Sequence, residues 1–193
     1  MPIKPKTTII YAGSELTTQD YPNLEVICEE TDKPAELFNR HIEQGFGDSV
    51  VVGFMGRDYD FTMDNAVSLM VDKLSDAAII GAVYADLIVE NVIDESSTMM
   101  ANQYLPAFHA NLLSGHIPIM SPVFIKTNLL TQQRFHPKLK KLYHWLFFLT
   151  ISQNILSAHI PLPLFKRHQV YDANTTTASD YKYIQQWLTQ QDT

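Results

Sequence analysis

The segment VVVGFMGRDYD, residues Val50–Asp60, predicts the centre of the fold. Its β-branched and apolar start, just after Gly47-Asp48, is typical of a buried strand in a parallel sheet. At the carboxyl end of such a strand, side chains reach the crevice in which open α/β sheets bind ligands. Asp58 and Asp60 point the same way if the backbone stays extended, which suits Mg²⁺ or Mn²⁺ bound with a substrate diphosphate. The alternative is a strand followed by an ordinary acidic turn.

Composition predicts one globular domain. The chain has 193 residues, 46% of them hydrophobic, and a formal net charge of −7. The length suffices for one substantial core, and the acidic balance argues against non-specific binding of nucleic acid or anionic membranes. Cys28 is the single cysteine, which excludes a disulfide framework and a cysteine zinc site. The N-terminus lacks the apolar run of a secretory signal, and polar residues and prolines interrupt Trp145–Phe165, so we expect a cytoplasmic protein without a transmembrane segment.

Predicted strands and helices alternate along the chain. Besides the central segment, strands are predicted at Thr7–Ala12, Leu24–Cys28, Ala77–Tyr84 and Val123–Lys126. Helices are predicted at Pro34–Gln44, Met63–Leu74, Lys138–Ser152 and Ser179–Gln190, with short ones over residues 14–19 and 104–113. This alternation indicates an α/β fold with a mostly parallel, right-handed sheet flanked by helices. Residues 91–103 are expected to form a loop, and Ile155–Phe165, which contains Pro161 and Pro163, is expected at a sheet edge.

Seven short motifs follow one another between residues 7 and 170. They are Gln19–Ile27, Glu29–Asp32, Asn39, Val50–Asp60, Ala82–Asp86, Leu112–His116 with Ser121–Leu130, and Leu162–His168. In this order they resemble the nucleotide-sugar-dependent glycosyltransferases of family 2, which have the GT-A fold. The motifs of that family include Q-x-Y-P-N-x-E-I-I, D-D-G-S, Y-I-x-F-L-D-x-D-D, x-V-Y-G-D and L-x-x-Y-R-x-H. Each motif is weak alone, and the specificity lies in their common order.

The resemblance implies a single GT-A-like domain over residues 1–193. Residues 1–90 would form the nucleotide-sugar-binding half, residues 91–170 the acceptor-side half, and residues 171–193 a C-terminal helix and tail. The implied donor is a UDP-type nucleotide sugar and the acceptor is unknown; a role in polysaccharide biosynthesis follows by analogy only. Asp58 and Asp60 would coordinate Mg²⁺ or Mn²⁺, which neutralises charge on the leaving diphosphate. The donor would contact Glu30, Asp58, Asp86, Arg167 and His168.

The chain departs from the family pattern at three places. The segment before Gln19 is shorter, and Glu29-Glu30 replaces the acidic pair D-D without a following glycine. Aligned on Trp145, the family's E-D-x-x-x-W helix start places Lys140-Lys141 at the catalytic base, where a lysine cannot serve unless burial greatly lowers its pKa. The catalytic residue is therefore unassigned. The chain is interpreted as a sugar transferase, as a degenerate GT-A domain that binds nucleotide sugars or proteins without catalysis, or as an α/β interaction protein; a homo-oligomer is compatible with each. A further carboxylate on the acceptor side of the crevice would favour an enzyme.

Overall fold

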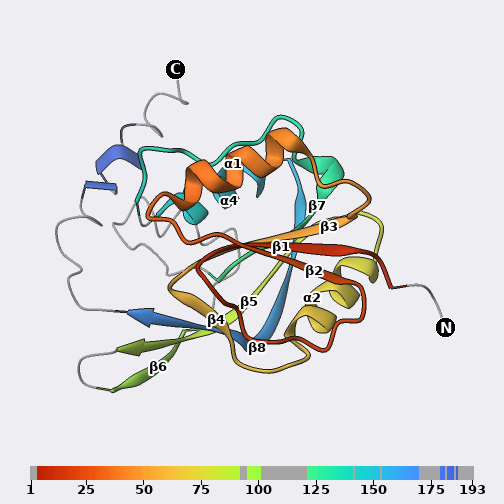
Figure 1. The fold of residues 1–193 in the computed structure, drawn as a ribbon, viewed down its shortest axis with the longest axis horizontal. Helices are drawn as coiled ribbons and strands as arrows, with labels where there is room; N and C mark the ends of the chain where they lie inside the picture. Colours follow the sequence, from red (N-terminus) through yellow and green to blue (C-terminus); the bar gives the residue numbers. More distant parts are fainter. Residues whose placement is uncertain are drawn as a thin grey trace.

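A mixed sheet of eight strands forms the centre of the described part of the protein (Figure 1). This computed structural model describes residues 4–91, 95–100, 121–140, 142–152, 154–169, 179–180, 182–184 and 186. The strands are β1 (Thr7–Ala12), β2 (Leu24–Cys28), β3 (Val51–Gly56), β4 (Tyr59–Phe61), β5 (Ile80–Asn91), β6 (Ser97–Met100), β7 (Phe124–Lys126) and β8 (Leu156–Gln169). Their order is β2-β1-β3-β7-β5-β8-β4, with β6 beside β5.

Two parallel groups of strands are joined by one antiparallel strand. β2, β1 and β3 pair in parallel, and so do β5 and β8. The short strand β7 runs antiparallel to both β3 and β5. Consequently β1, β3, β5 and β8 all point their carboxyl ends to the same edge of the sheet, where open α/β sheets carry their ligand sites.

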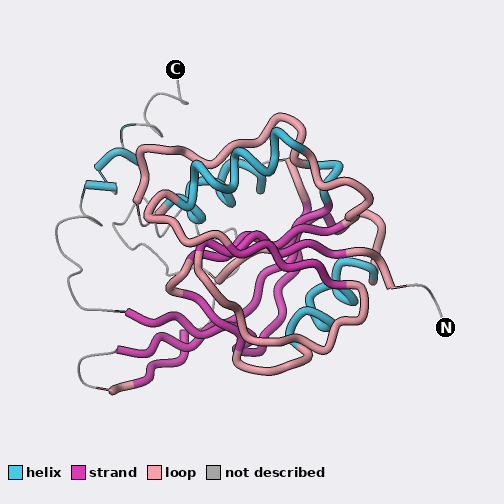
Figure 2. The backbone as a smooth tube through the Cα atoms, in the orientation of Figure 1, coloured by secondary structure: helices cyan, strands magenta, loops and turns pink. Residues whose placement is uncertain are grey.

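Helices cover both faces of the sheet (Figures 1 and 2). α1 (Pro34–Gln44) and α4 (Tyr143–Ser152) pack on one face, where Phe38 and Phe148 lie in one core cluster with Phe54 of the central strand. α2 (Ala66–Ser75) packs on the other face, where Met70 meets Met55. Because both faces are covered, β1 and β3 are buried along their whole length. A single 3₁₀ turn, η1 (Thr127–Leu129), follows β7.

The α/β class and several element bounds agree with the sequence prediction. Thr7–Ala12, Leu24–Cys28 and Pro34–Gln44 have the predicted bounds, and the central segment forms β3 as expected. The other predicted strands and helices are shifted: α2 starts three residues late, β5 extends to Asn91, and α4 begins at Tyr143. The predicted helix over residues 104–113 and most of the C-terminal one lie outside the described residues.

Two predictions of local structure were wrong. Residues 14–19 form an extended loop instead of a short helix, because Gln19 bonds α2: its Oε1 accepts from Val67 N at 3.1 Å and its Nε2 donates to Met63 O. Within the expected loop of residues 91–103, Ser97–Met100 is a strand that pairs antiparallel with β5. The segment STMM has two polar residues followed by two methionines and lacks the apolar alternation that marks a half-buried strand, so the sequence pattern missed it.

The proline-containing strand lies in the sheet but is irregular at its prolines. β8 lies between β5 and β4, yet β4 pairs only with Phe165–Arg167. Among the described strands, only β5 forms a ladder with the segment that contains Pro161 and Pro163; on its other side Thr62 donates to Pro163 O and Leu164 O, and the pairing with β5 shifts register between Ala85 and Leu87. Proline has no N–H to donate and is tolerated at such irregularities, so the predicted edge character holds for this half of β8.

In the described part of the chain, no helix is long and apolar enough to cross a membrane.

Candidate functional site

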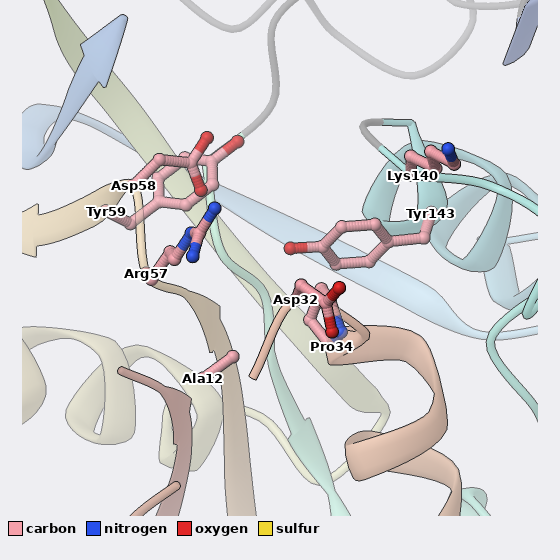
Figure 3. Close-up of a pocket in the computed structure, with 8 residues that line it drawn as sticks. All are labelled: Ala12, Asp32, Pro34, Arg57, Asp58, Tyr59, Lys140 and Tyr143. Carbon is pink, nitrogen blue, oxygen red and sulfur yellow. The ribbon is translucent and has the colours of Figure 1, made fainter. Parts of the chain in front are cut away.

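A small pocket opens at the carboxyl edge of the sheet, where β1 and β3 end (Figure 3). Its volume is about 110 Å³. It is lined by Ala12, Asp32, Pro34, Arg57, Asp58, Tyr59, Lys140 and Tyr143. These residues come from the end of β1, the loop between β2 and α1, the turn between β3 and β4, and the start of α4. We call this the Asp58 pocket.

Asp58 is fixed in the pocket wall by the last strand of the sheet. The Arg167 Nε donates to Asp58 Oδ2 at 2.8 Å, and the backbone N–H of His168 donates to Asp58 O at 2.8 Å. The Arg167 side chain is only 13% exposed, whereas that of Asp58 is 31% exposed. A charge-assisted bond to a largely buried guanidinium is strong, so Asp58 has a defined orientation without any ligand. The predicted neighbours Asp58, Arg167 and the backbone of His168 are thus brought together.

Tyr59 completes the surroundings of Arg167. The guanidinium carbon lies 5.4 Å from the centre of the Tyr59 ring, a cation–π distance. Burial raises the pKa of Tyr59 to about 12. The Tyr59 phenol and the Asp58 carboxylate raise the pKa of Arg167 above its usual value. Arg167 is therefore a permanent cation at this site, and it compensates the charge of Asp58.

The opposite wall of the pocket is the Tyr143 ring, whose hydroxyl points toward Arg57 and Asp58 (Figure 3). The ring is 4% exposed and packs against Phe38 and His144, with centroid separations of 5.9 and 4.4 Å. Burial raises the pKa of the Tyr143 phenol well above its ordinary value, so the hydroxyl keeps its proton at neutral pH. It can donate a hydrogen bond into the pocket.

Gly56, the last residue of β3, makes room for that hydroxyl. A Cβ placed on Gly56 would collide with the Tyr143 hydroxyl and lie 2.9 Å from Asp58 Oδ1. Any side chain at this position would displace one of these two polar groups. Close approach of the Tyr143 hydroxyl to the strand therefore requires glycine here.

The turn that precedes α4 is held by a distant carboxylate. Asp180 Oδ2 accepts from the backbone N of Lys140 at 3.0 Å and from Leu142 N at 3.1 Å. Asp180 is 3% exposed and satisfies two N–H groups of the turn before α4. This contact places Lys140 at the rim of the pocket, on the Tyr143 side (Figure 3).

The other residues predicted for the site lie outside the Asp58 pocket. Asp60 accepts hydrogen bonds from Thr17 Oγ1 and Phe61 N and lies 4.0 Å from Lys166 Nζ. Glu30 is exposed in the loop after β2. Asp86 is 3% exposed in β5, where it pairs with His159 Nε2 at 2.7 Å. The side chain of His168 points to Glu90, with Nδ1 to Oε2 at 3.1 Å.

Three pocket residues were missed by the sequence analysis. Asp32 belongs to the acidic segment Glu29–Asp32, but it is the fourth residue of that segment that lines the pocket, not Glu30. Arg57 stands between the strand and Asp58, and its exposed side chain lies beside that carboxylate (Figure 3). Tyr143 lies in the predicted helix Lys138–Ser152 and was not among the predicted site residues. No local pattern marks these residues, because the pocket is assembled from four separate segments.

The metal-ligating capacity of the site is limited. Among the residues that the structure describes, no group of three or more His, Cys, Asp or Glu could hold a metal ion. The pocket offers the carboxylates of Asp32 and Asp58, the latter bonded to Arg167. Asp60 does not line the Asp58 pocket, and its Oδ1 accepts hydrogen bonds from Thr17 Oγ1 and Phe61 N.

Comparison with known proteins gives no family assignment. No family model matches the chain, and no curated protein matches it. One similar solved structure is 4-diphosphocytidyl-2C-methyl-D-erythritolsynthase from Anaerococcus prevotii DSM 20548, with 12% identity, 96% of each chain covered and a TM-score of 0.42. Another is A197 from STIV, with 10% identity, 81% of this chain and 82% of the other covered, and a TM-score of 0.41. At these scores neither likeness bears on the function.

Proposed function

We propose that this chain is a GT-A-type domain that binds a nucleotide sugar in the Asp58 pocket. The supporting observation is the pocket itself: Arg57, Asp58 and Asp32 meet at the carboxyl edge of β1 and β3. A volume of about 110 Å³ accommodates a phosphate group or one sugar ring. A whole nucleotide sugar needs a site of roughly 300 Å³ or more, so the remainder of the ligand lies outside this pocket.

Sugar transfer from a UDP-type donor to an acceptor is the first candidate activity. It rests on the ordered motifs and on Asp58 at the predicted position after the central strand. The sequence resemblance implies that Mg²⁺ or Mn²⁺ would neutralise charge on the leaving diphosphate, and Asp58 is the one predicted ligand that lines the pocket. Arg167 would fix the orientation of that carboxylate.

Binding without transfer is the second candidate, and the wall formed by the start of α4 favours it. That wall contributes Lys140 and Tyr143, and no carboxylate among the described residues. Inverting transfer needs a base that deprotonates the acceptor hydroxyl, and a carboxylate is the usual one. The exposed ammonium of Lys140 cannot take that role.

Calorimetric titration with UDP, GDP and their sugar conjugates tests the proposal. Arg57→Gln should weaken binding about tenfold because it removes a charge-assisted hydrogen bond. Arg134→Gln is the matched control, since Arg134 is exposed and lies outside the pocket. Absence of binding by every nucleotide and sugar conjugate, with or without Mn²⁺, would refute the proposed function.

A turnover assay separates the two candidates. The same nucleotide sugars are incubated with the protein and candidate acceptors, and release of the nucleoside diphosphate is measured. Release that Asp58→Asn abolishes and Asp60→Asn leaves intact identifies a transferase. Tight binding without release across the panel identifies a binding module.

A further inference from the structure

We infer that the Asp58 pocket holds the phosphate of its ligand directly, through Arg57, Lys140 and the Tyr143 hydroxyl, without a bridging metal ion. The inference rests on the proposed function and names the chemistry by which the ligand is recognised: a diphosphate or phosphate ester met by protein cations. It departs from the metal site that the sequence resemblance implies.

The space beside the strand end is already occupied. A metal bridge between two carboxylates at the end of β3 requires a second acidic side chain close to Asp58. The other carboxylate of the pocket, Asp32, comes from the loop between β2 and α1, and position 56 at the end of β3 cannot supply one, because even a Cβ there would collide with the Tyr143 hydroxyl. The hydroxyl is held in place by a ring that is 4% exposed and packed among other aromatic rings. The protonated phenol can donate a hydrogen bond to an oxygen of a ligand in the pocket.

Asp58 is already compensated by a protein cation. Its Oδ2 accepts from Arg167 Nε at 2.8 Å, and Arg167 also faces the Tyr59 ring. A metal ion at Asp58 would lie close to this largely buried guanidinium, and the two positive charges would repel each other at low dielectric. Asp60 does not line the pocket, and its Oδ1 already accepts from Thr17 and Phe61.

The remaining charges of the pocket favour an anion. With Asp58 and Arg167 paired, two cations, Arg57 and Lys140, face one further carboxylate, Asp32. Among the described residues, neither Arg57 nor Lys140 forms an ion pair with an acidic side chain. A positive pocket is a local exception on a chain of net charge −7. Arginine offers a planar fork for phosphate oxygens and lysine a mobile point charge.

The inferred arrangement assigns a part to each side chain. Arg57 would bind two oxygens of the phosphate from the β3–β4 turn, and Lys140 would reach the same group from the rim. The Tyr143 hydroxyl would donate to a third oxygen from the opposite wall, toward which it already points (Figure 3). Asp58 then pairs with Arg167 rather than with a metal, and Asp32 remains to accept from a hydroxyl of the ligand.

Calorimetry on metal-stripped protein tests this inference with two probes, UDP and inorganic pyrophosphate. Each is titrated in buffer containing EDTA and again with Mg²⁺ or Mn²⁺. We expect both probes to bind in EDTA, with affinities that the metals change less than about threefold. Arg57→Gln and Lys140→Gln should each weaken binding about tenfold in EDTA. Lys138→Gln is the matched control, because Lys138 is exposed and lies outside the pocket. The substituted residues are all exposed, so the variants should fold, which circular dichroism verifies.

The outcomes separate this inference from the proposed function. Binding that EDTA abolishes and Mn²⁺ restores overturns the inference and leaves nucleotide binding intact. Equal affinities for Arg57→Gln, Lys140→Gln and Lys138→Gln overturn it as well. Binding of pyrophosphate without any nucleotide supports the phosphate site and refutes the nucleotide-sugar proposal. Failure of both probes under every condition refutes both.

Discussion

Replacement of Gly56 by alanine tests the close approach of Tyr143 to the central strand. The new Cβ would collide with the Tyr143 hydroxyl, and the buried ring cannot move aside. Overpacking of this kind costs about 2 kcal/mol, and the lower entropy of the unfolded alanine chain offsets about 0.5 kcal/mol. We therefore expect Gly56→Ala to lower the free energy of unfolding by about 1.5 kcal/mol, or the melting temperature by about 4 °C for a chain of this size.

A double-mutant cycle with Tyr143→Phe identifies the cause. Without the hydroxyl, the nearest polar atom to the new Cβ is Asp58 Oδ1 at 2.9 Å, at the end of a partly exposed side chain that can shift. Gly56→Ala should then be nearly neutral in the Tyr143→Phe background, which gives a coupling energy of about 1.5 kcal/mol. Urea denaturation followed by tryptophan fluorescence measures all four proteins. An equal cost of Gly56→Ala in both backgrounds would refute the reasoning.

Four further substitutions test other parts of the site. His144 has a buried Nε2 without a hydrogen-bond partner among the described residues, and burial lowers its pKa to about 3. Below the ordinary histidine pKa of 6.5, the unfolded state therefore binds a proton that the folded state does not bind. The stability of the fold decreases as the pH falls through this range. His144→Phe should raise the free energy of unfolding by about 1 kcal/mol at neutral pH and by about 3 kcal/mol near pH 5, as urea titrations at both pH values measure; a gain that does not grow on acidification would contradict this. Asp58→Asn should lower the free energy of unfolding by about 2 kcal/mol in the same assay, because it leaves the Arg167 guanidinium without its carboxylate. Asp60→Asn should lower it by less than about 1 kcal/mol. Equal losses would argue against a largely buried Asp58–Arg167 pair. Asp180→Ala removes the acceptor of two N–H groups before α4 and should lower the free energy of unfolding by about 1 kcal/mol. Thermal denaturation monitored by circular dichroism measures this loss. An unchanged melting temperature would show that these two hydrogen bonds do not stabilise the fold.

Elements with a strong local pattern were predictable, and those without one were not. The β-branched runs of β1 and β2 and the proline-started α1 have the predicted bounds, because local propensity and burial point to the same structure there. The loop before Gln19 and the hairpin strand β6 were mispredicted. The loop depends on a partner far along the chain, α2, whereas β6 is defined by its pairing with the preceding strand β5.

In the candidate site, too, some features follow from the local sequence and others depend on the tertiary structure. The sequence by itself determined the buried strand Val51–Gly56, the acidic turn after it and the α/β class, since hydrophobic patterning over a few residues suffices for these. Only the tertiary structure decided that Asp58 faces the pocket while Asp60 turns to Thr17, and that Arg167 and Tyr143 flank Asp58. Arg167 lies 109 positions from Asp58. Which side chains meet at a sheet edge depends on strand order and register, and these are global properties of the packed chain that no short segment encodes.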